Sequence, residues 1–139
     1  MNGGTRTIRL LLVDDEPAVR RGLKMRFALE PDFEVVGEAG SVAEAISLTQ
    51  ALRPDVILID VEMAGMDGIL AIETLHQAAP HSAVGITLYD DAAMRARARE
   101  VGAAALVAKH QTVETLLAAI RRAAVEHVKE EHGDDMRDR

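Results

Sequence analysis

Short aliphatic runs alternate along this chain with longer stretches in which apolar residues recur at helical spacing. The alternation predicts βα units, in which each buried strand is followed by a helix that returns the chain across a parallel sheet. Residues 8–13 and 56–59 are continuous aliphatic runs, as is typical of central strands covered on both faces. Weaker strand candidates are residues 33–36, 83–88 and 104–108. The sequence therefore predicts an α/β fold with five strands.

Residues that start and stop helices lie between these strands. Pro17 suits the first turn of a helix that runs to about Leu29, and Pro31 closes that helix. Ser41 followed by Glu44 has the spacing of a capping box. Further boundaries are predicted by Pro54 after the second helix, by Gly68 and Pro80 around the third, by Asp91 and Gly102 around the fourth, and by Thr112 before a fifth that ends near Val125.

The length of 139 residues predicts one domain with a core of its own. We place this domain at residues 1–125. Residues 126–139 contain six acidic and three basic side chains and almost no apolar periodicity. This composition predicts a charged tail that frays or extends the last helix into solvent.

Composition excludes several classes of function. The chain has no Cys, so it has no thiolate nucleophile, no disulfide and no cysteine-based metal site. Aromatic residues make up 2% of the chain, too few for a platform that stacks nucleic-acid bases. The formal charge of −7 disfavours binding to DNA or to anionic membranes. No apolar run is long enough for a membrane span or a signal peptide, and we expect a cytoplasmic protein.

Reactive side chains follow the predicted strands. Asp14 and Asp15 end the first strand, and Asp60 ends the third. Thr87 and Lys109 end the fourth and fifth. Because ligands bind at the carboxyl ends of parallel strands, we expect these residues to form one site. Three adjacent carboxylates repel one another unless a hard cation that prefers oxygen ligands holds them ionised, and Mg²⁺ is the natural occupant.

A carboxylate, a metal, a hydroxyl and an ammonium group together suit phosphoryl transfer. Metal and Lys109 neutralise the phosphoryl oxygens, while Thr87 donates a hydrogen bond. Asp60 is the best candidate for the nucleophile, because it leaves an apolar strand and enters a loop with two glycines.

The chain resembles the receiver domains of two-component response regulators over roughly residues 6–125. The matching motifs are residues 11–17 (LLVDDEP), 54–60 (PDVILID) and 65–68 (GMDG), together with Thr87, Gly102-Ala103 and Lys109. The resemblance implies a flavodoxin-like sheet of order 2-1-3-4-5, with five helices on both faces. The entry into the fifth helix, residues 109–112 (KHQT), is similar to the branch that usually carries a helix-turn-helix output.

The resemblance also implies roles for individual residues. Asp60 would accept a phosphoryl group from a histidine kinase or phosphotransfer protein. Asp15 would bind Mg²⁺ directly, Asp14 mainly through water, and Glu62 through its backbone carbonyl. Thr87 would hydrogen-bond the phosphoryl group and Lys109 would pair with it. The output would be a downstream effector protein or an output domain, and a homodimer formed on phosphorylation is one further option.

Three positions depart from the family pattern. Ala64 stands where many members have Pro, which loosens the loop backbone. His110 stands where many have Pro, so a cis bond there is not assumed. Leu106 stands where many have Tyr or Phe that swings inward on activation. Leu106 therefore occupies the switch position without the aromatic ring whose inward movement usually accompanies activation.

Two further side chains lie where they can tune the lifetime of the phosphorylated form. Glu62 follows Asp60 by two residues, and Tyr89 follows Thr87 by two. Each can orient or block the water that hydrolyses an acyl phosphate, and we expect Tyr89 to slow this attack. Two rival functions stay open: a Mg²⁺-dependent phosphohydrolase, which would need a substrate pocket, and an interaction module that is never phosphorylated.

Overall fold

Five parallel strands form one sheet in the order β2-β1-β3-β4-β5. The computed structural model describes residues 6–63 and 67–137, with the side chains of its last helix up to residue 129. The predicted fold class and strand order are confirmed. The strands are β1 (Ile8–Val13), β2 (Phe33–Ala39), β3 (Val56–Asp60), β4 (Ser82–Thr87) and β5 (Ala103–Ala108).

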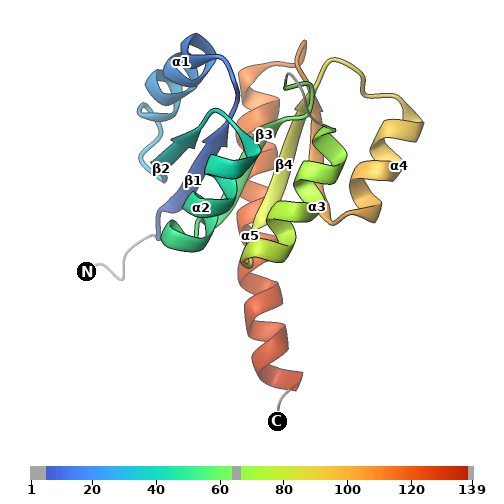
Figure 1. The fold of residues 1–139 in the computed structure, drawn as a ribbon. Coiled ribbons are helices and arrows are strands. Elements are labelled where there is room, and N and C mark those ends of the chain that lie inside the picture. The colour runs from blue at the N-terminus through green and yellow to red at the C-terminus, as the bar shows by residue number, and fades with distance from the viewer. Residues whose placement is uncertain (1–5, 64–66, 138–139) are drawn as a thin grey trace.

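Helices cover both faces of this sheet (Figure 1). They are α1 (Pro17–Phe27), α2 (Val42–Leu52), α3 (Gly68–Ala78), α4 (Ala92–Glu100) and α5 (Val113–Arg137). Alternate residues of the central strands point to opposite faces, so the core has two layers. Leu11 and Ile57 pack with residues of α2, α3 and α4. Leu10 and Leu58 pack with residues of α1 and α5.

The helix caps follow the sequence signals. The Ser41 hydroxyl accepts a hydrogen bond from the Glu44 N–H at 3.2 Å. The Glu44 carboxylate accepts from the Gly40 N–H, one residue before the usual capping-box donor. Asp91 caps α4 by accepting from the Met94 N–H at 2.8 Å. Such caps satisfy backbone donors that a helix leaves free at its start.

The last helix extends further than the sequence predicted. The predicted helix end near Val125 is wrong, because α5 continues to Arg137. Its C-terminal part extends beyond the sheet in Figure 1, which matches the alternative of a last helix that extends into solvent. His127 is buried against the sheet, with its Nε2 3.9 Å from Asp55 Oδ1. The first turn after Val125 therefore packs, and the division into 1–125 and 126–139 remains a prediction. Across residues 6–63 and 67–137, no helix combines the length and apolar character needed to cross a bilayer.

Candidate functional site

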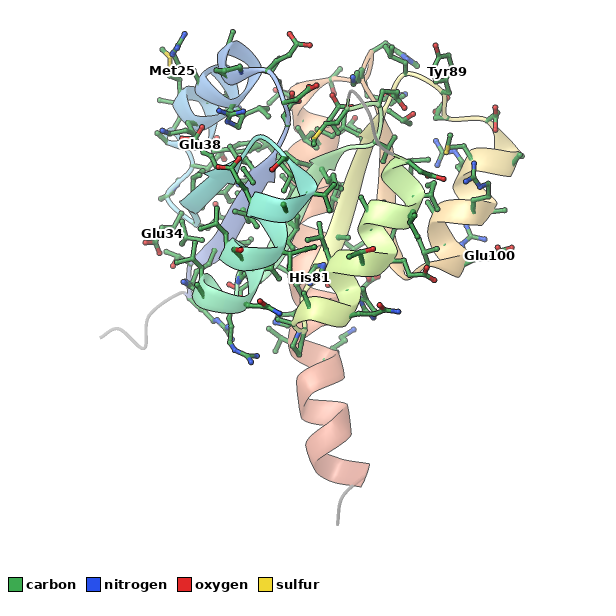
Figure 2. The ribbon with its side chains drawn as sticks, in the orientation of Figure 1. Met25, Glu34, Glu38, His81, Tyr89 and Glu100 are labelled. Atoms are coloured by element: carbon green, nitrogen blue, oxygen red, sulfur yellow. The ribbon has the colours of Figure 1, made fainter. Side chains whose placement is uncertain are left out.

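The carboxyl edge of the sheet collects the reactive side chains that the sequence singled out. Asp60 is the last residue of β3 and Thr87 the last of β4. Asp14 directly follows β1, and Lys109 directly follows β5. In Figure 2 Tyr89 lies at this end of the molecule, whereas His81 lies at the opposite end. The parallel sheet thus brings residues distant in sequence to one edge.

Three carboxylates form the acidic part of the site. One oxygen from each of Asp14, Asp15 and Asp60 lies within 4.8 Å of the other two. Burial raises the pKa of Asp14; the hydrogen bond from the Glu16 N–H opposes this, and the negative charges of Asp60 and Asp15 add to it. The positive charge of Lys109 offsets this only in part, so the pKa of Asp14 remains raised. The hard oxygen donors of the cluster fit a divalent cation such as Mg²⁺.

Lys109 supplies a positive charge beside these carboxylates. Its Nζ lies 3.1 Å from Asp60 Oδ1 and 3.2 Å from Oδ2. Burial alone would lower the pKa of Lys109, but the hydrogen bond to Asp60 and the negative charges of Asp60, Glu62 and Asp14 raise it above its usual value. Lys109 is thus held as an ammonium ion against the Asp60 carboxylate. Its backbone N–H donates to the Thr87 carbonyl, which fixes β5 beside β4 at this point.

The Glu62 side chain turns into the site. The Thr87 hydroxyl donates to Glu62 Oε2 at 2.5 Å, and the Leu88 N–H donates to Oε1 at 2.7 Å. Glu62 Oε1 also lies 3.6 Å from Lys109 Nζ. The sequence pattern predicts roles for the Glu62 carbonyl and for its position two residues after Asp60, but it does not predict these side-chain contacts. No sequence signal fixes the direction of that side chain.

Arg20 of α1 contacts the backbone of the acidic cluster. Its Nη1 donates to the Asp14 carbonyl, and its Nε pairs with Glu38 on β2 at 3.0 Å. The Asp14 carboxylate in turn accepts from the Glu16 N–H at 2.9 Å. The place of Arg20 at the site is not predictable from its local sequence, because its partners lie on or directly after two different strands.

The two remaining predicted site residues differ in their surroundings. Tyr89 is 60% exposed, and its backbone N–H donates to the Thr87 hydroxyl at 2.9 Å. Leu106 is buried in the core layer of α2 to α4, where its Cδ1 covers Gly85. Leu106 therefore fills a space in the core. The predicted loosening at Ala64 lies outside the described residues.

Comparison with known proteins adds independent information. A family model described as the response regulator receiver domain matches residues 10–121. The nitrate/nitrite response regulator protein NarP of Escherichia coli K12 is 38% identical over 117 residues, covering 84% of this chain and 54% of NarP. NarL of the same strain is 33% identical over 118 residues, covering 83% and 54%. The chain spans about half the length of these curated relatives.

Solved structures of receiver domains have the same fold as this chain. The response regulator domain of Thermotoga maritima CheB superposes with a TM-score of 0.77 at 32% identity, covering 86% of this chain and 97% of that domain. The signal receiver domain of the putative response regulator NarL from Mycobacterium tuberculosis superposes with a TM-score of 0.73 at 31% identity, covering 84% and 98%.

Proposed function

The chain belongs to the response regulator receiver domains, and from that premise we propose that it is a phosphorylation-dependent switch with Asp60 as the phosphoacceptor. One observation carries the assignment. Lys109 Nζ bridges both carboxylate oxygens of Asp60 at 3.1 and 3.2 Å, beside the carboxylates of Asp14 and Asp15. Asp60 is the carboxylate of this cluster that directly contacts the Lys109 ammonium, and this ammonium can also pair with a phosphoryl group on Asp60.

Four groups would hold Mg²⁺: the carboxylates of Asp14, Asp15 and Asp60, and the backbone carbonyl of Glu62. When bound, the ion would neutralise charge on the carboxylates and on the phosphoryl oxygens. The proximity of the three carboxylates supports this assignment, since without a cation their negative charges oppose one another.

The chain's own residues account for the transfer. An Asp60 carboxylate oxygen attacks phosphorus, a P–O bond forms, and the donor's P–N bond breaks with its electron pair returning to the imidazole nitrogen. The Lys109 ammonium pairs with the Asp60 carboxylate before the transfer and with the phosphoryl oxygens after it. The Thr87 hydroxyl then donates to one of these oxygens. Thr87 ends β4, which pairs with the Asp60 strand, and Lys109 follows β5, which pairs with β4, so the site needs no large rearrangement of the sheet.

Acetyl phosphate with Mg²⁺ is expected to add one phosphate to the wild-type chain and none to Asp60→Asn. Intact-mass measurement tests this. Asp90→Asn is the matched control, because it removes an equally sized carboxylate that forms an ion pair with Arg95 at the surface. Equal modification of Asp60→Asn and wild type would contradict the assignment, and continuous release of phosphate from many substrate esters would favour a phosphohydrolase.

The partners follow from the same proposal. The donor would be a histidine kinase or a phosphotransfer protein in the cytoplasm. The output would be an effector protein or an output domain, because relatives such as NarP are about twice as long as the matched region. A homodimer formed on phosphorylation belongs to the same proposal.

Tyr89→Ala is expected to shorten the half-life of the phosphorylated chain severalfold. Tyr89 lines the same cavity as Glu62, and we expect loss of its ring to open a path for water to the acyl phosphate. The backbone hydrogen bond from Tyr89 to Thr87 remains in this variant, so the hydroxyl keeps its place. Decay is followed by intact mass after the phosphodonor is removed, with Leu88→Ala as the exposed neighbouring control. An unchanged or longer half-life in Tyr89→Ala would refute the shielding role.

A further inference from the structure

The Glu62 carboxylate already contacts the groups that a phosphoryl group on Asp60 needs. It accepts from the Thr87 hydroxyl and the Leu88 N–H, and it lies 3.6 Å from the Lys109 ammonium. A hydroxyl, a backbone N–H and an ammonium group form a binding place for an anion's oxygens. In this structure the anion is part of the chain itself.

We propose that Glu62 is an internal competitor of the phosphoryl group. Its carboxylate occupies the anion position while Asp60 is unmodified and leaves this position when Asp60 is phosphorylated. The inference rests on the proposed function, because it assumes that the phosphoryl group forms on Asp60. It makes Glu62 a positioning residue that raises the cost of phosphorylation.

The two anions exclude one another for two reasons. The Thr87 side chain is 0% exposed and its hydroxyl has a single proton, so it donates either to Glu62 or to a phosphoryl oxygen. A phosphoryl group beside a carboxylate also adds like charges within contact distance, which disfavours both. Phosphorylation therefore requires the Glu62 side chain to rotate away.

The Glu62 carboxylate has a second possible position next to the one it occupies. The residues that line a cavity of about 220 Å³ include Glu62, Tyr89, Met94 and Arg97, and Asp67 lines it too. Arg97 is on α4, and its guanidinium contacts Asp67 at 3.6 Å, a long and largely exposed ion pair that leaves donors free for a second carboxylate. Rotation of Glu62 toward Arg97 would connect the end of β3 to α4. This connection does not need an aromatic ring at the switch position, which Leu106 occupies.

The test is binding of fluoroberyllate with Mg²⁺, followed by NMR of backbone amides. Glu62→Gln keeps the size of the side chain and removes its charge, and we expect it to bind about tenfold more tightly than wild type. Glu73→Gln, an exposed residue of α3, is the matched control and should bind like wild type. The Leu88 amide resonance should shift on binding in wild type, as its partner changes from Glu62 to fluoroberyllate.

Arg97→Gln tests the second position. We expect it to weaken binding severalfold when Glu62 is present and to have no effect in the Glu62→Gln background, because only a charged carboxylate needs the guanidinium. Glu62→Ala guards against an effect specific to glutamine, and it should also bind more tightly than wild type. Thermal unfolding confirms that each variant is folded.

The outcomes separate this inference from the proposed function. If wild type binds fluoroberyllate but both Glu62 variants bind equally or more weakly, the competitor role is overturned while Asp60 stands. If wild type and every variant fail to bind and to accept phosphate at Asp60, the proposed function itself is overturned, and the inference with it.

Discussion

Gly68→Ala is expected to lower the free energy of unfolding by about 3 kcal/mol, the upper range for a small-to-large change in a packed core. A Cβ atom on Gly68 would lie 2.2 Å from the Val61 carbonyl oxygen and 2.4 Å from its Cα. Both are backbone atoms, so a side-chain rotation cannot relieve the overlap. Val61 directly follows Asp60, and its N–H donates to the Ile86 carbonyl on β4 at 3.0 Å. The strain therefore falls on the segment that carries Asp60 and Glu62.

Urea unfolding measures the stability, and acetyl phosphate labelling measures the site. We expect Gly68→Ala to lose labelling even under conditions where it remains folded. Gly22→Ala is the matched control, because no atom lies within 4 Å of its Cβ position on α1. In a helix this change should stabilise the fold by about 0.5–1 kcal/mol. Wild-type stability and labelling in Gly68→Ala would show that Val61 can move without cost.

The sequence was sufficient for the sheet and for the convergence of the site. Continuous aliphatic runs at residues 8–13 and 56–59 predict central strands, because a strand covered on both faces has no polar side. The parallel arrangement then places Asp60, Thr87 and Lys109 at one edge whatever the details of the helices. These predictions depend on chain direction and burial, which a single sequence records well.

The contacts that complete the site were not predictable in the same way. The Glu62 side chain has several rotamers, and its choice of Thr87 and Leu88 depends on a neighbouring strand whose register the sequence does not give. Arg20 likewise joins Asp14 to Glu38 across two elements. Long polar side chains gain from such contacts only after the backbone is in place, so their local sequence carries no signal.

The end of α5 was mispredicted for a related reason. The predominance of charge after Val125 favours solvent exposure on average, yet His127 is buried and only 3.9 Å separates its ring from Asp55. A helix buries one face per turn, so a single residue at the right phase can pack within a charged segment. The composition of a segment does not show which of its residues faces the protein, so the burial of His127 could not be predicted from it.

His81 is expected to make the protein sensitive to acid. It precedes β4, far from the candidate site, and it is 2% exposed. Its Nδ1 donates to the Ala79 carbonyl at 2.8 Å, while its Nε2 has no hydrogen-bond partner in the described part of the chain. The pKa of His81 is lowered from 6.5 to about 4, chiefly by burial and also by the neighbouring His76 and His127, against the opposing effect of the hydrogen bond to Ala79.

The direction of the effect follows from the two states of the protein. The folded chain holds His81 neutral, whereas the unfolded chain takes up a proton below about pH 6.5. The stabilisation from neutral His81 is therefore complete above about pH 6.5 and is lost as the pH falls toward 4. A difference of this size corresponds to about 3 kcal/mol between pH 7.5 and pH 4.

Urea unfolding of wild type and His81→Leu across this pH range isolates the contribution. Carboxylates such as Asp32, whose pKa the hydrogen bond from Arg121 lowers, also lose stabilisation in acid, but they do so equally in both proteins. The loss on acidification should be smaller in His81→Leu by about 3 kcal/mol, whatever the variant's stability at neutral pH. His76→Gln, at an exposed position facing His81 at 5.9 Å between ring centres, should keep nearly the wild-type loss. Parallel pH profiles for wild type and His81→Leu would mean that His81 accepts a proton in the folded state without penalty.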